Sequence, residues 1–203
     1  MKLTIFKPQY WLVFFILCGL SALAFMLFSA LVPHQKPATN LNGMAMHNIN
    51  APAFTLKNRQ QQPLMLSTIT SKPTYLSFGY RHCAETCPVQ LATLKQLFQA
   101  TGNTVNYVWI SLDPEQDRDM PSITGQMDFT ALIELFPQDN QSADNLLHQY
   151  YGQVVRNNDT AVNPISHSSY IYLIDTNGQI LALYKANDFT TDMILDDFRA
   201  LNL

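Results

Sequence analysis

The distribution of hydrophobic and polar positions separates the start of the chain from the rest. Residues 10–32 contain no charged residue, and about twenty apolar residues are what a helix needs to cross a bilayer core of about 30 Å. The run is longer than the apolar core of about 7–15 residues that a cleaved signal peptide has. We therefore expect a single transmembrane anchor over residues 10–32, preceded by a short tail over residues 1–9.

The remaining residues divide into a polar segment and a folded domain. Residues 33–50 are rich in Pro, Asn and small side chains without periodicity, which predicts a flexible tether. Over residues 51–203, apolar runs of strand and helix length alternate with polar turns. A length of 203 residues accommodates one anchor and one domain of ordinary size, but not a second full domain.

The pattern within residues 51–203 predicts a definite order of elements. Apolar triplets indicate a short hairpin, and two apolar runs indicate buried strands with a helix between them. An Asn-Gly turn then joins two further strands. In chain order we expect strands 54–56 and 64–66, strand 75–80, a helix around Leu91, Leu94, Leu97 and Phe98, strand 107–112, helices 131–136 and 143–151, strands 169–175 and 180–184, and helix 192–201. A βαβ unit followed by a ββα unit predicts an α/β, thioredoxin-like fold with a central mixed sheet flanked by helices.

Two of the three cysteines lie where a predicted strand ends and a predicted helix begins. Ligands bind at such an edge of an α/β sheet. Cys83 and Cys87, placed on the first turn of a helix, would have Cα atoms about 6 Å apart, inside the disulfide range of about 4.4–6.8 Å. The amino end of a helix also stabilises a thiolate, which binds metal or attacks disulfides. The pair can therefore close as a disulfide or hold a metal ion.

His167 is the candidate for a third metal ligand. It closes the segment 163–167, directly ahead of a predicted strand, and in a thioredoxin-like fold the loop at this place faces the cysteines. Two sulfurs and an imidazole suit copper, because thiolates select Cu(I) and nitrogen raises the affinity for Cu(II).

Three motifs occur in the order found in a known family: YLSFGYRHCAETCP, VWISLDPEQD and SHSSYIYLIDTNG. Through them, the stretch from Phe54 to Leu201 resembles the Sco/SenC copper chaperones, which have a thioredoxin fold. The resemblance implies that Cys83, Cys87 and His167 are the ligands of one copper ion, Cu(I) or Cu(II). It also implies that the copper is carried to the binuclear copper centre of cytochrome oxidase. The chain departs from the family at Ala84, where proline is usual, and in a short segment 113–128.

Charge and topology limit the expected partners and location. The net charge is −3 and the twelve Lys and Arg are scattered, so nucleic acid is not an expected partner. Lys2 and Lys7 favour a cytoplasmic tail. The domain would then face the periplasm from a bacterial inner membrane, where thiols can be oxidised. The expected partners are a copper-accepting oxidase subunit or another copper protein, and a thiol reductant protein.

Two alternative functions use the same residues. A periplasmic thiol–disulfide oxidoreductase would use Cys83 and Cys87 as a redox-active pair to reduce the copper-site cysteines of an acceptor. A thiol redox sensor would use their disulfide as a switch. Such reductases have two residues between their cysteines and a proline in the facing loop, whereas this chain has three residues and His167. The sequence therefore favours a copper chaperone without catalytic turnover.

Three further features have simple interpretations. His82 is expected to point away from the site by strand alternation. Asp113-Pro114 is expected to close a turn after a strand, and could orient the site indirectly. Met44, Met46 and His47 could bind Cu(I) transiently, although a chance cluster in a flexible linker is the preferred interpretation.

Overall fold

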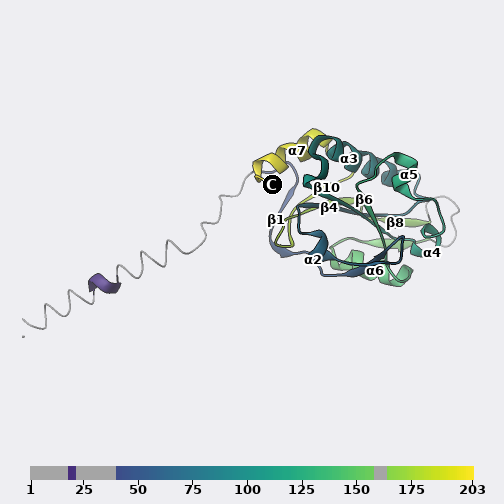
Figure 1. The fold of residues 1–203 in the computed structure, drawn as a ribbon, viewed down its shortest axis with the longest axis horizontal. Coiled ribbons are helices and arrows are strands. Elements are labelled where there is room, and N and C mark those ends of the chain that lie inside the picture. The colour runs from purple at the N-terminus through teal and green to yellow at the C-terminus, as the bar shows by residue number, and fades with distance from the viewer. Residues whose placement is uncertain (1–17, 22–39, 158–163) are drawn as a thin grey trace, which may run out of the picture. The chain divides into compact units, whose positions relative to one another are not determined.

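The computed structural model describes residues 18–21, 40–157 and 164–203 (Figure 1). The chain divides into two units, residues 1–39 and 40–203. In the first unit Cys18–Ser21 are helical, and the rest of the anchor predicted over residues 10–32 lies outside the described residues. Within the described part of the chain, no helix combines the length and apolar character needed to cross a membrane.

A mixed sheet forms the centre of the second unit. Its strands are β1 (Met44–Asn50), β2 (Thr55–Asn58), β3 (Pro63–Met65), β4 (Thr74–Gly79), β5 (Asn106–Ser111), β6 (Leu132–Phe136), β9 (Tyr170–Ile174) and β10 (Gln179–Lys185). These eight described strands lie in the order β1-β10-β9-β4-β5-β6-β2-β3. β5 is parallel to both β4 and β6, whereas the other neighbours are antiparallel.

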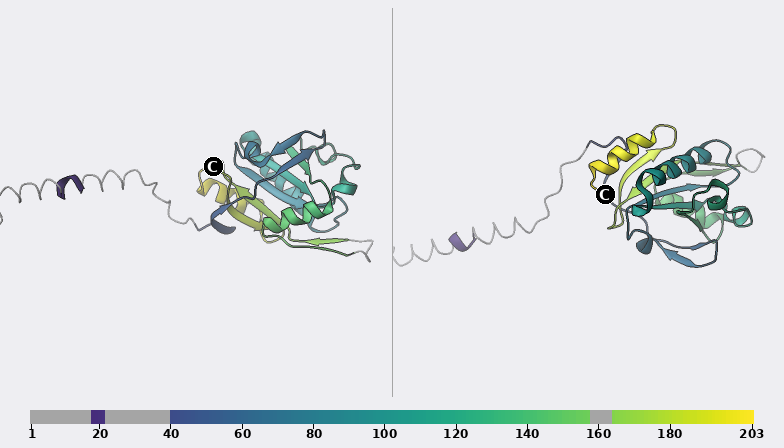
Figure 2. Two further views of the ribbon diagram at one scale, coloured as in Figure 1. Left: turned by 90° about the horizontal axis from the view of Figure 1, so that it is seen from below. Right: turned by 45° about the horizontal axis from the view of Figure 1, so that its top comes forward.

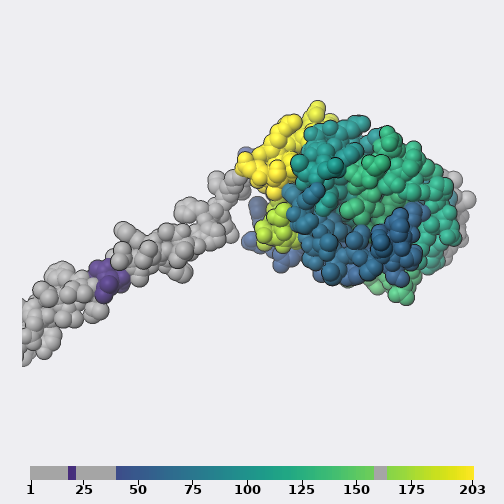
Figure 3. Space-filling model, in the orientation of Figure 1, coloured from purple at the N-terminus to yellow at the C-terminus, as the bar shows by residue number. Residues whose placement is uncertain are grey.

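Helices cover both faces of this sheet. They are α2 (Leu66–Ile69), α3 (Thr86–Thr101), α4 (Pro114–Asp117), α5 (Ile123–Met127), α6 (Asn140–Gln149) and α7 (Thr191–Ala200), with a short 3-10 helix, η1 (Gly102–Thr104). Figures 1 and 2 show α3 and α7 over one face and α6 over the other. In the space-filling view, α7 and α3 lie next to each other on the surface of the domain (Figure 3). The predicted thioredoxin-like arrangement, a central mixed sheet flanked by helices, is confirmed.

The core around β4 and β5 is rich in aromatic side chains. Tyr75 stacks on Tyr107 with ring centroids 6.2 Å apart, and Phe78 packs edge-on against Tyr150 at 5.4 Å. All six residues of β4 are buried, because helices cover both faces of the sheet. Large buried aromatic groups contribute strongly to stability. A rigid strand therefore ends at Gly79, a few residues ahead of the cysteines.

Most of the predicted elements are confirmed, but the helix predicted over residues 131–136 is wrong. This run forms strand β6, which pairs with β5 on one side and β2 on the other. A short apolar run is compatible with either a buried strand or a helical turn. Here the run is a strand because it pairs with β5 and β2. The following helix, α6, begins at Asn140. Asp139 caps it by accepting the Ser142 backbone N–H at 2.7 Å.

The flexible tether predicted over residues 33–50 is wrong for residues 44–50. These residues form β1, which pairs antiparallel with β10 at the edge of the sheet. The folded unit accordingly begins at Asn40 and not at Ala51. Residues 33–39 lie outside the described residues. A segment without apolar periodicity can still form a strand, because pairing with β10 satisfies its backbone groups.

Candidate metal centre

The cysteine turn, residues 80–87, joins β4 to α3. The helix begins at Thr86, so Cys87 lies in its first turn and Cys83 lies in the preceding loop, whereas both were expected on the helix. The Cys87 backbone N–H donates to the Cys83 Sγ at 3.4 Å. The first N–H groups of a helix have no partner within it. The Cys83 sulfur therefore acts as the acceptor that an N-cap side chain would otherwise supply.

The space behind the two cysteines is closely filled. A Cβ atom added at Gly79 would lie 2.3 Å from atoms of the Trp109 ring and 2.9 Å from the Cys87 Sγ. Real Cβ atoms do not approach other atoms so closely, so a larger residue at the end of β4 would force the surrounding core to shift. Cys87 is 2% exposed and Cys83 is 9% exposed. Packing of the core thus fixes the Cys87 sulfur, and the Cys87 backbone N–H holds the Cys83 sulfur beside it.

His167 comes from a small sheet that the sequence did not predict. β7 (Val154–Arg156) and β8 (Ile165–His167) form a two-stranded antiparallel pair, here called the histidine ribbon, which is separate from the main sheet. The ribbon replaces the loop that was expected ahead of β9. The His167 Nδ1 lies 3.0 Å from the Ser168 carbonyl oxygen. With Nδ1 donating this bond, the lone pair of Nε2 is free to bind a metal ion.

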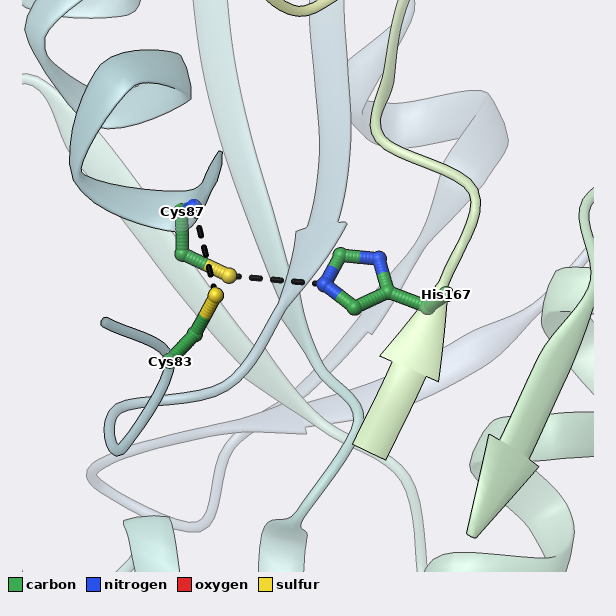
Figure 4. A group of neighbouring side chains, drawn as sticks. All are labelled: Cys83, Cys87 and His167. Carbon is green, nitrogen blue, oxygen red and sulfur yellow. Dashed lines mark hydrogen bonds between the residues drawn. The ribbon is translucent and has the colours of Figure 1, made fainter. Parts of the chain in front are cut away.

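The structure brings the three predicted ligands together. The His167 Nε2 lies 3.4 Å from the Cys87 Sγ, and the ligand atoms of Cys83, Cys87 and His167 all lie within 4.8 Å of one another. Figure 4 shows both sulfurs and the imidazole pointing toward one point. A trigonal ion with metal–sulfur bonds of about 2.3 Å and a metal–nitrogen bond of about 2 Å needs ligand atoms about 4 Å apart. The arrangement therefore fits one metal ion.

The two thiols differ in their electrostatic environment. The hydrogen bond with the Cys87 side chain lowers the pKa of Cys83 despite burial. The same hydrogen bond, together with burial, raises the pKa of Cys87. Cys83 is consequently the thiolate and Cys87 the protonated partner. Binding of a metal ion to both sulfurs has to release the proton of Cys87.

Asp117 is a buried carboxyl group that the sequence did not single out. Its Oδ1 accepts the Arg81 backbone N–H at 3.1 Å, and its Oδ2 accepts the Ser111 hydroxyl at 2.7 Å. It therefore ties the cysteine turn to the end of β5. Burial raises the pKa of Asp117 to about 6. One feature of the sequence could have drawn attention to Asp117. It is the second aspartate of Asp113-Pro-Glu-Gln-Asp117 and lies one helical turn after the first.

A pocket of about 170 Å³ opens beside the ligand atoms, with Cys83, Thr86, His167 and Ser169 in its wall. The Tyr80 ring, which also lines the pocket, packs edge-on against the His167 ring at 5.9 Å. The Thr86 Oγ1 lies 3.7 Å from the Cys83 Sγ. The pocket gives a small reagent or a ligand group of another protein access to the cluster.

The other residues noted in the sequence lie outside this cluster. His82 is exposed and is not among the grouped ligands, as expected. Asp113 is buried and precedes α4, so a short helix replaces the simple turn. Met46 packs against the core, whereas Met44 is 61% exposed and His47 is exposed. These three possible ligands therefore do not lie together: Met46 contacts the core, and Met44 and His47 are exposed to solvent.

The fold and the site together define a class of protein: a thioredoxin-like domain with a two-thiol, one-imidazole metal site next to its central strand. The family model described as SCO1/SenC matches residues 43–202. The chain belongs to this family. The matched region starts just before β1, in agreement with a domain that begins ahead of residue 51.

Individual proteins of known name or structure resemble this chain. Protein SenC of Rhodobacter capsulatus is 28% identical over 177 residues, which cover 82% of this chain and 78% of that protein. Arabidopsis thaliana ScoI, solved with copper bound, has a TM-score of 0.63 at 21% identity and covers 74% of this chain and 98% of its own. BsSco, described as having a disulfide switch and as a member of the Sco family of cytochrome c oxidase assembly proteins, has a TM-score of 0.61 at 18% identity. That match covers 77% of this chain and 96% of BsSco.

Proposed function

We propose that this chain is a copper-binding metallochaperone that holds one copper ion, Cu(I) or Cu(II), between Cys83, Cys87 and His167. The observation that carries the proposal is the convergence of two sulfurs and one imidazole nitrogen within 4.8 Å. Thiolates select Cu(I), and imidazole suits copper in both valences. Family membership and the copper bound to Arabidopsis thaliana ScoI support the choice of metal.

The acceptor in this proposal is an oxidase subunit or another copper protein. The description of BsSco as a member of a family of cytochrome c oxidase assembly proteins supports delivery to the binuclear copper site of cytochrome oxidase. The pocket beside Cys83 and His167 lets an incoming thiol or imidazole replace one ligand at a time. An anchor over residues 10–32 would hold the domain on the periplasmic side of a bacterial inner membrane, close to such an acceptor.

Loading in this proposal depends on the redox state of the cysteines. Metal binds thiolates, so a disulfide between Cys83 and Cys87 has to be reduced first. A thiol reductant protein is therefore the second proposed partner. The thiolate of Cys83 and the pocket beside it give that partner a route to the sulfurs.

A second candidate function, thiol–disulfide oxidoreductase, is favoured by the difference between the pKa values of the two thiols. A thiolate at Cys83 next to a protonated Cys87 is the form that attacks a disulfide. Such an enzyme would reduce the copper-site cysteines of an acceptor, and a redox sensor would use the same pair as a switch. A substitution of His167 distinguishes these functions from copper binding. Copper binding depends on the imidazole much more than thiol exchange does.

The test compares His167→Ala with His82→Ala in the reduced full-length chain in detergent. His82 is the matched control because it is an exposed histidine next to Cys83. We expect His167→Ala to weaken copper binding by at least about tenfold, and His82→Ala to leave it unchanged, measured by competition with a copper chelator. Unchanged copper affinity in His167→Ala would defeat the chaperone proposal. Disulfide reduction that persists in the same variant would then favour the oxidoreductase.

A further inference from the structure

The histidine ribbon lies beside the main sheet and depends on a small number of contacts for its position. The described residues of β7 and β8 pair with each other in a sheet of their own. β8 is fixed by buried Ile165 and, just beyond it, by the Ser169 hydroxyl, which donates to the Thr86 Oγ1 at 2.9 Å. β7 has exposed Val155 at its centre. Val154 packs against the core, and Arg156 supplies the side-chain hydrogen bonds that attach β7 to the rest of the domain.

Arg156 holds the end of β7 through a fork of hydrogen bonds. Its Nε donates to the Asp144 Oδ2 at 2.9 Å and its Nη2 to the Asp144 Oδ1 at 2.6 Å. The Nη2 also donates to the carbonyl oxygens of Leu112 at 2.7 Å and Asn140 at 3.3 Å. The side chains of the ion pair are only 26% and 22% exposed. A partly buried, two-pronged pair of this kind fixes geometry as well as adding stability.

The Leu112 peptide extends this fork to the cysteine side of the site. While its carbonyl accepts from Arg156, its N–H donates to the Gly79 carbonyl oxygen at 2.8 Å. Gly79 is the last residue of β4 and directly precedes the cysteine turn. Across the ribbon, Arg156 pairs with Ile165, two residues before His167. A short series of hydrogen bonds therefore links the strand of the histidine to the strand of the cysteines.

We propose that Arg156 is a positioning residue for the metal ion: it holds the histidine ribbon where the His167 Nε2 meets the two thiols. This inference rests on the proposed copper-binding function. Arg156 acts through the β7–β8 pairing and does not touch the ion. When the guanidinium is removed, both sulfurs stay in place. Only the His167 imidazole moves away from the position at which it can bind the ion.

The experiment is a double-mutant cycle between Arg156 and His167 in the reduced full-length chain in detergent. Arg156→Met keeps much of the side-chain length and removes the fork. We expect it to raise the Kd for Cu(I) by about tenfold to a hundredfold, as for other groups that orient a metal ligand. In the His167→Ala background the same substitution should have no further effect. Arg199→Met is the control, since the Arg199 pair with Asp196 is exposed on α7.

Two further measurements distinguish positioning from general stability. Asp144→Asn removes one partner of the fork, so it should give a smaller loss of affinity even where Arg156→Met folds poorly. In the metal-free protein, hydrogen exchange of the Asn157 and Ser168 amides, which close the ribbon, should be faster in Arg156→Met. Exchange of the Cys87 amide should not change.

Three results would overturn the proposal. The first is a copper affinity in Arg156→Met equal to that of the unaltered chain, and the second is an equal loss of affinity in the His167→Ala background. The third is unchanged exchange of the ribbon amides. If the unaltered chain binds no copper, the proposed function fails, and hydrogen exchange alone decides whether Arg156 positions the ribbon.

Discussion

The cysteine turn and the histidine ribbon bring ligands to the same point by different means. The turn follows β4, whose six residues are all buried, and the Cys87 sulfur lies close against Gly79 near the Trp109 ring. The ribbon consists of two strands of three residues each, outside the main sheet. Polar contacts of Arg156 and burial of Ile165 hold it in place.

This difference indicates which half of the site can adjust. Side chains in a close-packed core cannot move far without loss of contacts, so the sulfurs should stay fixed. Segments with few buried contacts open at a lower free energy. We therefore expect metal uptake and release to proceed by movement of the histidine ribbon, while the cysteine turn serves as the fixed side.

The largest expected effect is that of a side chain at the end of β4. Gly79→Ala places a Cβ atom against the Trp109 ring and the Cys87 sulfur, so the core has to shift. Overpacking of this kind costs about 3 kcal/mol, which urea denaturation would measure as a loss of unfolding free energy. Gly125→Ala is the control, because no atom lies within 4 Å of its added Cβ. Equal stability of the two variants would show that the cysteine side is not rigid.

Asp117 gives the next effect, a dependence of stability on pH. Its pKa is raised from 3.8 to about 6 by burial, so the folded state binds its proton more tightly than the unfolded state. The contribution of this group to stability therefore falls as pH rises from about 4 to above 6. Between pH 4.5 and 7.5 the difference amounts to about 2 kcal/mol.

Asp117→Asn should remove this part of the pH dependence. The measurement is urea denaturation at both pH values, with the exposed Asp119→Asn as the control. A variant whose unfolding free energy depends on pH as strongly as that of the unaltered chain would contradict the account. The carboxyl group beneath the cysteine turn would then not be the source of the effect.

The smallest of these effects concerns the reactivity of the two sulfurs. The pKa of Cys83 is lowered by its hydrogen bond with the Cys87 side chain, so Cys83 stays a thiolate below the ordinary thiol pKa of about 8.5. In the metal-free chain, iodoacetamide should modify Cys83 at least about tenfold faster than Cys87 at pH 6, as measured by mass spectrometry. The urea-unfolded chain is the control, in which the two cysteines should react alike. Equal rates of modification in the folded chain would contradict a lower pKa for Cys83 than for Cys87.

The sequence predicted the cysteine side of the site better than the histidine side, for a physical reason. Cys83 and Cys87 sit between an apolar strand and an amphipathic helix, so local pattern alone places them. The ribbon has three-residue strands, with exposed Val155 and charged Arg156 in β7. Such short strands have no periodicity of their own, and contacts with residues far away in the chain determine them.

The same distinction explains the errors elsewhere in the fold. β6 and β1 are strands because β5, β2 and β10 pair with them, and neither pairing is visible in local composition. Asp117 was missed because its importance depends on burial beneath a turn that is distant in sequence. His167, in contrast, was found by its place ahead of β9 and by the resemblance to the Sco/SenC family.

The central claim is that one copper ion lies between two sulfurs and one imidazole nitrogen. X-ray absorption of the reduced full-length chain loaded with Cu(I) tests it most directly. The account predicts two sulfur ligands and one imidazole nitrogen per copper, with the nitrogen signal absent from His167→Ala. A spectrum without nitrogen, unchanged by that substitution, would contradict the claim.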